Sequence, residues 1–298
     1  MPSYTAFGLT FQSEIAIPEF EHLDDRLPDV IIRSGAVPNA LTAPTTQTTH
    51  LYQINRTELL YRVPGVARYY VHDGREMVIE SEPGIDEASV RAFLLTTVLA
   101  GLMHQRRMFP LRASAVQTPR GAVLFAGDSV SGKSTLAGIF LVKGYRLLHD
   151  NLAPIEVGAD GKLYTTPGYP ALKLWEASAS YLDIKTQNLQ SVRPGMPCYM
   201  YPVADQFARE KQEINTIYVI GNGSEKTDAV FDIRDATGFQ MLLASLYCPR
   251  FPQQMGILPE YWAQLTKVTS ILCKRLVWLK AFDDRVHKII RGIEGEWL

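Results

Sequence analysis

The first 83 residues alternate between short apolar runs and turn residues. The runs YTAFGLTF, VIIRSG, ELLYRVPG, ARYYVHDG and EMVIESEPG are rich in β-branched and aromatic residues and end at Gly, Pro or Asp-Gly. Short runs bounded by turn residues predict strands joined as hairpins. The segment 36–50, rich in Thr, Pro and Ala, predicts an exposed loop. We therefore expect a β-rich N-terminal domain over residues 1–84.

The pattern changes after Pro83-Gly84. Asp86 and Glu87 favour a helix start, because acidic side chains complement the positive end of the helix dipole. The following stretch, VRAFLLTTVLAGLMHQRR, is apolar on most sides, which is typical of a buried helix. Residues 85–108 are thus predicted to form a helix that connects two regions.

The second region mixes strand and helix patterns. LRASAVQ and AVLFA predict two strands, SGKSTLAGIFLVKG predicts a helix that ends at Gly144, and YRLLHDN predicts a third strand. EINTIYVIG and DAVFDIR predict further strands. From Ala236 the spacing becomes helical, through GFQMLLASLY, EYWAQLTKVTSILCKRLVWL and DDRVHKIIRGIEGEWL. Residues 109–298 are predicted to form an α/β domain with a helical C-terminal region, in which Trp262, Trp278 and Trp297 belong to the core.

Composition narrows the function class. The net charge of -1 argues against general binding to nucleic acid or to anionic lipid. The N-terminus does not have the pattern of a signal peptide, and the longest apolar stretch, residues 92–103, falls short of the roughly 20 residues that cross a bilayer. The cysteines Cys198, Cys248 and Cys273 are far apart, which predicts free thiols. A cytoplasmic setting is expected, without membrane or nucleic-acid partners.

A candidate phosphate-binding motif begins at Gly127, which is followed after four residues by Gly132-Lys133-Ser134. A loop of this kind between a buried strand and a helix turns its N–H groups inward, where they bind phosphate. Lys133 would reach the β- and γ-phosphates, and the Ser134 hydroxyl would ligate Mg²⁺. The alternative is that these residues form only a Gly/Ser-rich turn between the strand and the helix. The predicted nucleotide-binding residues are Gly127, Asp128, Ser129, Val130, Ser131, Gly132, Lys133, Ser134 and Thr135.

Phosphate transfer also requires a group that orients the acceptor hydroxyl and accepts its proton. Asp150 follows Lys133 by 17 residues, an interval filled by a helix, a glycine turn and a short strand. In a β-α-β unit the carboxyl ends of both strands lie at the same edge of the sheet, so we expect Asp150 beside the loop. An aspartate that caps a turn would explain the same residue equally well.

Five segments carry a resemblance to a known family: FAGDSVSGKSTLA, LRASAV, LVKGYRLLHDNLAPI, TPGYPALKLW and VPGVARYYVHDG. They resemble the HPr kinase/phosphorylase family, and more closely its relatives encoded beside lasso-peptide biosynthesis genes. The resemblance implies a P-loop kinase core related to that of phosphoenolpyruvate carboxykinase, which uses ATP and Mg²⁺ and phosphorylates a serine hydroxyl. In the lasso-associated relatives, the acceptor is a serine near the C-terminus of a precursor peptide. Asp150 matches the first of the family's paired aspartates, assigned as the general base. Family members can be hexamers, so a homo-oligomer is possible.

Four positions depart from the family pattern. Asn151 replaces the second aspartate. Arg112 stands where the family has a histidine; it cannot shuttle a proton, but it can clamp a phosphate or a peptide carboxylate. Val130 replaces a usual glycine and is strained if its φ is positive. Lys173 lies near the place of an acidic family signature, and we interpret it as a solvated strand residue.

We therefore expect an ATP-dependent kinase that transfers the γ-phosphate to a serine hydroxyl of a peptide. Asp150 and Lys133 are its predicted catalytic residues, and Arg112 and Asn151 are candidates for contact with the substrate. A non-catalytic nucleotide-binding accessory protein and a small-molecule kinase are the alternatives. His149 is expected to be a partly exposed residue at a strand end. Residues 199–201 are expected to form a strand packed on the core, with a peptide groove as the alternative.

Overall fold

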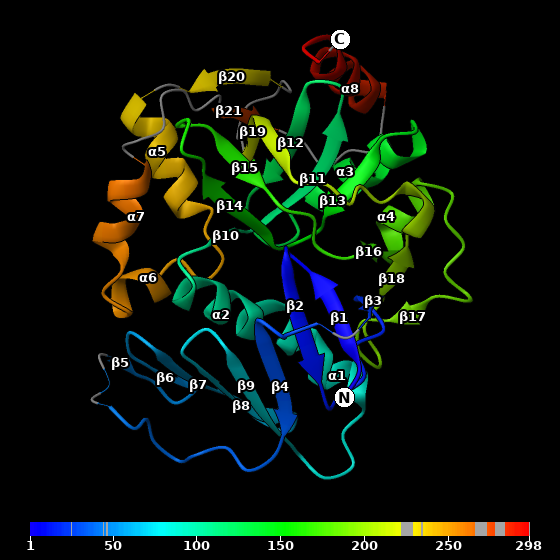
Figure 1. The fold of residues 1–298 in the computed structure, drawn as a ribbon. Helices are drawn as coiled ribbons and strands as arrows, with labels where there is room; N and C mark the ends of the chain where they lie inside the picture. The colour runs from blue at the N-terminus through cyan, green and yellow to red at the C-terminus, as the bar shows by residue number, and fades with distance from the viewer. Residues whose placement is uncertain are drawn as a thin grey trace.

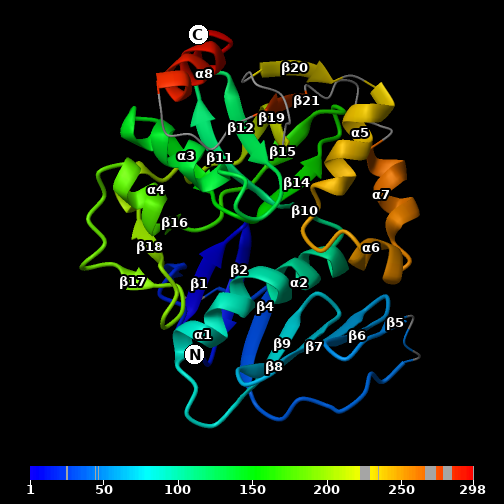
Figure 2. The ribbon, with the colours of Figure 1, turned by 180° about the vertical axis from the view of Figure 1, so that it is seen from behind.

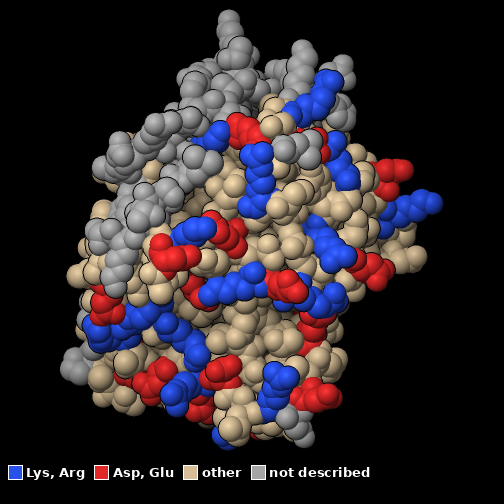
Figure 3. Space-filling model, turned by 45° about the horizontal axis from the view of Figure 1, so that its top comes forward, with Lys and Arg blue, Asp and Glu red and all other residues tan. Residues whose placement is uncertain are grey.

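The computed structural model describes residues 1–24, 26–43, 45, 47–221, 229–233, 235–265, 273–277 and 284–297. Two large sheets lie one above the other with a long helical segment between them, and a small sheet lies beside them (Figures 1 and 2). The chain is therefore a mixed α/β protein. Basic and acidic side chains are interspersed on the face drawn in Figure 3. Among the described helices, none has the length and apolarity that crossing a membrane requires.

The N-terminal sheet has the order β3-β1-β2-β4-β9-β8-β7-β6-β5. Its strands are β1 Ser3–Ala6, β2 Leu9–Ser13, β3 Glu21–Leu23, β4 Val30–Ser34, β5 Gln47–Thr48, β6 Tyr52–Ile54, β7 Glu58–Val63, β8 Ala67–His72 and β9 Glu76–Ser81. The strands predicted from short apolar runs correspond to β1, β2, β4, β7, β8 and β9. The predicted loop 36–50 contains only the two-residue strand β5 among its described residues.

The connecting segment is a continuous helical stretch, as predicted. It consists of α1 Glu87–Phe93, a π-helical turn at Leu94–Val98 and α2 Leu99–Gln105. Asp86 caps its start, because the Asp86 carboxylate accepts a hydrogen bond of 2.8 Å from the Ser89 N–H. Most of its side chains are buried between the two large sheets. The π-helical turn has no counterpart in the sequence prediction.

The second sheet has the order β10-β14-β15-β19-β12-β11-β13, and β21 extends it beyond β19. Its strands are β10 Phe109–Leu111, β11 Ala113–Thr118, β12 Gly121–Ala126, β13 Arg146–His149, β14 Ala153–Val157, β15 Leu163–Thr165, β19 Gln212–Gly221, β20 Ala229–Ile233 and β21 Cys273–Val277. The strands β12 and β13 do not pair, because β11 lies between them and is antiparallel to both. They still run in the same direction, so both end at the same edge of the sheet.

The small sheet and the remaining helices complete the fold. The small sheet contains β16 Ala171–Trp175, β17 Gln190–Ser191 and β18 Cys198–Pro202, so the strand predicted at 199–201 is confirmed. The helices are α3 Lys133–Val142, α4 Glu176–Tyr181, η2 Ala204–Gln206, α5 Asp235–Ala244, α6 Phe251–Gln254, α7 Leu258–Leu265 and α8 Asp284–Gly295. The helix predicted from EYWAQLTKVTSILCKRLVWL is wrong at Cys273–Val277, which forms strand β21 because it pairs with both β19 and β20.

Two hydrophobic cores lie on opposite faces of the second sheet. The smaller core joins β11 and β12 to α3 and α8 through Val116, Phe125, Phe140 and Trp297. The larger core joins the other face of these strands to α2, to α7 and to the N-terminal sheet, so it continues across the predicted boundary between residues 84 and 109. Trp297 is buried as predicted, whereas Trp262 is 41% exposed, which contradicts its assignment to the core. Trp278 lies outside the described residues.

The first β-hairpin contacts the segment that precedes β16. The Phe7 N–H donates a hydrogen bond of 2.8 Å to the Pro167 carbonyl, and the Phe7 ring meets the Tyr169 ring edge-on at 5.9 Å between centroids. The Gly168 N–H in turn donates to the Leu148 carbonyl of β13 at 2.8 Å. These contacts connect the N-terminal sheet to the edge of the second sheet where β13 ends.

Candidate phosphate-binding site

The loop 127–132 joins β12 to the first residue of α3. Gly127, Val130 and Gly132 have φ values of 147°, 62° and 100°. Alternation of left-handed and right-handed residues turns successive N–H groups toward one point, which creates a concave site for an anion. A Cβ atom on Gly127 would lie 3.0 Å from the Ile220 carbonyl oxygen, so both space and conformation favour glycine there. The local structure predicted from the motif is present.

Lys133 points into this loop. Its side chain is buried, and its Nζ atom donates to the Asp128 carbonyl at 2.5 Å and to Ser131 Oγ at 3.3 Å. The ammonium therefore lies against the loop, where a bound phosphate would become its partner. The N-terminus of α3 lies at the same point and adds its positive dipole end.

Asp150 follows β13 and lies beside the loop, as its spacing predicted. The Ser134 hydroxyl donates to Asp150 Oδ1 at 2.8 Å, and the Ser114 hydroxyl donates to the same oxygen. The Lys173 backbone N–H donates to Oδ2 at 2.9 Å. Three donors from three elements therefore hold a buried carboxylate at the edge of the anion site. Whether Asp150 acts as a base stays a prediction.

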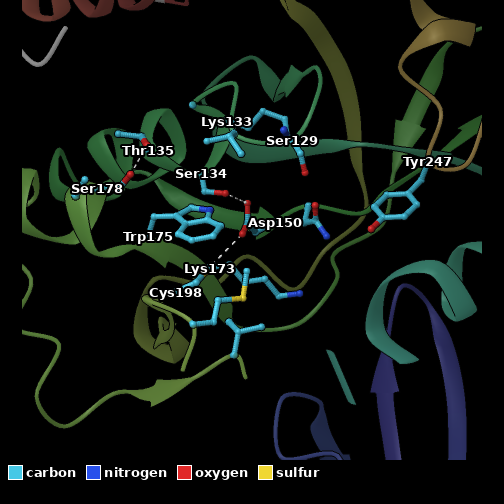
Figure 4. Close-up of a pocket in the computed structure, with 16 residues that line it drawn as sticks. Ser129, Lys133, Ser134, Thr135, Asp150, Lys173, Trp175, Ser178, Cys198 and Tyr247 are labelled. Atoms are coloured by element: carbon cyan, nitrogen blue, oxygen red, sulfur yellow. Dashed lines mark hydrogen bonds between the residues drawn. The ribbon is translucent and has the colours of Figure 1, made fainter. Parts of the chain in front are cut away.

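A cavity of about 400 Å³ opens in front of these residues (Figure 4). Thr135, Ser178 and Trp175 lie at one end, Tyr247 lies at the other, and Asp150 lies between them. Its lining contains Ser129, Val130, Gly132, Lys133, Ser134, Thr135, Asp150, Asn151, Lys173, Trp175, Ala177, Ser178, Val192, Met196, Cys198 and Tyr247. Of the predicted loop residues, Gly127, Asp128 and Ser131 do not line this cavity.

Lys173 differs from its interpretation as a solvated residue. It lies on β16, its side chain lines the cavity, and burial lowers the pKa of its ammonium while the Asp150 carboxylate opposes that shift. Lys173 is half-buried and pairs with Met200 of β18 in the small sheet. Sequence analysis missed its place in the site.

His149 is also corrected. It is 1% exposed, its ring Nε2 lies 2.8 Å from Thr165 Oγ1, and burial lowers its pKa to about 3. The residue lies in the core rather than at an exposed strand end, and it does not line the cavity. A neutral, buried imidazole of this kind supports the sheet and does not contact a ligand of the cavity.

The two candidate substrate residues lie on different sides of the loop. Asn151 lines the main cavity with φ 67°, a conformation that asparagine adopts more readily than most residues. It shares a hydrogen bond with Tyr247, whose pKa is raised by burial. Arg112 lines a smaller cavity of about 230 Å³ with Gly127 and Asp128. Its guanidinium lies 4.8 Å from the centre of the ring of Tyr247, which lines the main cavity.

The donor atoms at the loop fit Mg²⁺. The ion prefers oxygen ligands and is usually held by one or two protein groups together with phosphate oxygens and water. Ser134 Oγ and Asp150 supply oxygens 2.8 Å apart at the edge of the anion site. Within the described residues, no group of three or more His, Cys, Asp or Glu side chains could hold a metal ion. Cys198 and Cys248 are free thiols, and the Cys273 side chain is outside the described set.

Comparison with known proteins gives similarity to solved structures but not to a family model or a curated protein. No protein-family model matches the chain, and no curated protein matches it. Among solved structures, the HPr(Ser) kinase/phosphatase from Coxiella burnetii is similar over 63% of this chain and 97% of that chain, with 9% identity and a TM-score of 0.34.

Val130 provides a test of strain in the loop. Its side chain is 62% exposed, and its φ of 62° is unfavourable for a β-branched residue. Val130→Gly should raise the free energy of unfolding by about 1 kcal/mol, because it removes the strain at little cost in packing. Urea unfolding measures the change. The control Val142→Gly, at an exposed position in α3, should lower the free energy of unfolding by about 0.5 kcal/mol. Destabilisation by both variants would contradict strain at Val130.

Proposed function

We propose that this protein is an ATP-dependent kinase that transfers the γ-phosphate to a serine hydroxyl of a peptide. One observation carries the proposal: the Asp150 carboxylate lies 2.8 Å from the Ser134 hydroxyl, at the edge of the anion site that contains Lys133. Phosphoryl transfer depends mainly on positioning and on stabilising charge, and this arrangement supplies both.

Each residue has a defined part in the proposed reaction. The loop N–H groups and Lys133 would bind the phosphates, and Ser134 would hold Mg²⁺, which neutralises phosphate charge when bound. Asp150 Oδ2 accepts one hydrogen bond from the protein, so it retains a lone pair for the acceptor hydroxyl. The serine oxygen would form a bond to the γ-phosphorus, the bond to the bridging oxygen of ADP would break, and the serine proton would pass to Asp150.

The two ends of the cavity suggest how the substrates lie. Trp175 is 39% exposed at the Thr135 end and offers an indole face to the base of the nucleotide. The acceptor would enter at the Tyr247 end, where Asn151 lines the cavity and Arg112 lies behind the Tyr247 ring. Arg112 could bind a carboxylate of the acceptor there. A lasso-type precursor peptide with a serine near its C-terminus is the finer proposal, and it rests on the sequence resemblance.

A transfer assay tests the proposed function. The protein is incubated with Mg²⁺, ATP labelled at the γ-phosphate, and synthetic peptides that carry a serine near a free C-terminus. We expect label on these peptides and none on matched peptides with alanine in place of serine. Lys133→Met should reduce the label by about 100-fold or more, because it removes the fixed cation from the anion site.

Two other outcomes would contradict the proposal in different ways. Label on a sugar or nucleotide added to the assay, without label on peptide, would indicate a small-molecule kinase. ATP binding without transfer to any acceptor or to water would indicate a nucleotide-binding accessory protein. Replacing ATP with GTP in the same assay determines which nucleotide is used.

A further inference from the structure

Lys173 has no part in the reaction described above, yet it lies in the same cavity. We propose that the Lys173 ammonium binds the terminal phosphate of a nucleoside triphosphate from the side opposite Lys133, and so makes the site select a triphosphate over a diphosphate. This inference rests on nucleotide binding at the proposed site and adds a residue that recognises the γ-phosphate.

The position of Lys173 is fixed by its backbone. Its N–H donates to Asp150 Oδ2 at 2.9 Å, while the opposite oxygen, Oδ1, accepts from Ser134 of α3. Figure 4 shows Asp150 between Lys133 on the loop side and Lys173 on the small-sheet side. Both lysine side chains line the same cavity. A phosphate group that extends from the loop past Asp150 would therefore meet a cation on each side.

The charges around Lys173 favour an incoming anion. The cavity lining contains two lysines and one aspartate, so its charge is positive before a ligand binds. The groups that face Lys173 are Asp150, Cys198 and Glu19. Burial raises the pKa of Cys198 to about 11, which keeps the thiol neutral, and Glu19 forms an ion pair with Arg91 at 3.1 Å. Asp150 already accepts hydrogen bonds from three donors, so the half-buried Lys173 ammonium would gain from a further anionic partner.

The position also explains selectivity for the third phosphate. In a loop of this type, the N–H groups bind the α- and β-phosphates and the loop lysine reaches the β- and γ-phosphates, so the outer side of the γ-phosphate is open to a second cation. Lys133 lies within the loop, whereas Lys173 lies beyond Asp150 on a separate sheet. A diphosphate would therefore contact the loop and Lys133 but would leave Lys173 without the anion.

Binding measurements with two nucleotides test the inference. Dissociation constants for Mg²⁺-ADP and for the non-hydrolysable analogue Mg²⁺-AMP-PNP are measured by calorimetry. The wild-type protein should prefer AMP-PNP. Lys173→Met should weaken AMP-PNP binding by about 10- to 100-fold and change ADP binding by less than about 3-fold. Lys173→Arg, which retains the charge, should keep part of the preference for AMP-PNP.

Two controls separate this inference from general damage and from the proposed function. Lys162→Met removes an exposed lysine that pairs with Glu213 outside the cavity, and it should leave both affinities unchanged. Equal losses for ADP and AMP-PNP in Lys173→Met, or an unchanged preference, would overturn the role of Lys173 while the kinase proposal stands. Failure of the wild-type protein to bind either nucleotide would overturn both proposals.

Discussion

Asp150→Asn is expected to lower the rate of phosphate transfer by about 10²- to 10⁴-fold, while ATP binding changes little. Asparagine has nearly the shape of aspartate, but it cannot accept the serine proton. It also has only one acceptor oxygen, whereas Asp150 accepts from Ser114 and Ser134 on one oxygen and from the Lys173 N–H on the other. Single-turnover transfer with labelled ATP measures the rate, and calorimetry measures ATP binding.

A second aspartate serves as the matched control for this variant. Asp205 is exposed in η2 and does not line the cavity, so Asp205→Asn should leave transfer unchanged. If the wild-type protein and Asp150→Asn both bind ATP and are equally inert, the site is a nucleotide holder rather than a catalyst. If Asp150→Asn instead abolishes ATP binding, Asp150 acts mainly through the metal and the loop.

Acid should destabilise the protein well before its carboxylates are protonated. Burial lowers the pKa of His149 to about 3 and that of His104 to about 4, both from an ordinary value of 6.5. Below pH 6.5 the unfolded chain binds protons at these residues, whereas the folded protein binds them only near its lower pKa values. The free energy of unfolding is therefore fully retained above pH 6.5 and decreases as the pH falls toward 4. Each histidine should account for about 2 kcal/mol between pH 6.5 and 4.5.

Urea unfolding at several pH values between 6.5 and 4.5 measures this dependence. In the wild-type protein, His104 Nε2 lies 2.7 Å from the Tyr247 carbonyl oxygen. His104→Gln removes one of the two buried imidazoles, so the slope of the free energy of unfolding against pH should fall by the amount that corresponds to about one proton. His50→Gln, at an exposed position, should leave the slope unchanged. A free energy of unfolding that stays constant over this range in the wild-type protein would contradict the prediction.

The parts of the site that are close together in the sequence could be predicted, and the more distant parts could not. The motif predicted the loop and Lys133, and the helix-and-strand interval predicted the position of Asp150, because both depend on local geometry. Lys173 reaches Asp150 only through the pairing of β16 with β18, and Tyr247 reaches Asn151 from a loop after α5. Nothing in the pattern around either residue indicates such a contact.

The fold, too, could be predicted where a pattern is local and could not be predicted where an element depends on distant strands. Alternation and turn residues predicted most strands of the N-terminal sheet, because each pattern is contained within its own strand. The segment Cys273–Val277 was predicted as helix because a short apolar run fits both the helical period and the strand period. It forms a strand because it pairs with β19 and β20. The insertion of antiparallel β11 between β12 and β13 is likewise a property of the whole sheet.

The contact of the first hairpin with residues 167–169 has a consequence for assembly of the protein. Phe7 contacts Pro167 and Tyr169, and Gly168 between them is hydrogen-bonded to β13, the strand that Asp150 follows. A turn at residue 7 thus supports a segment that lies some 160 residues further along the chain. The edge of the sheet beside the phosphate loop can therefore take its final form only after both segments have been synthesised and have come into contact.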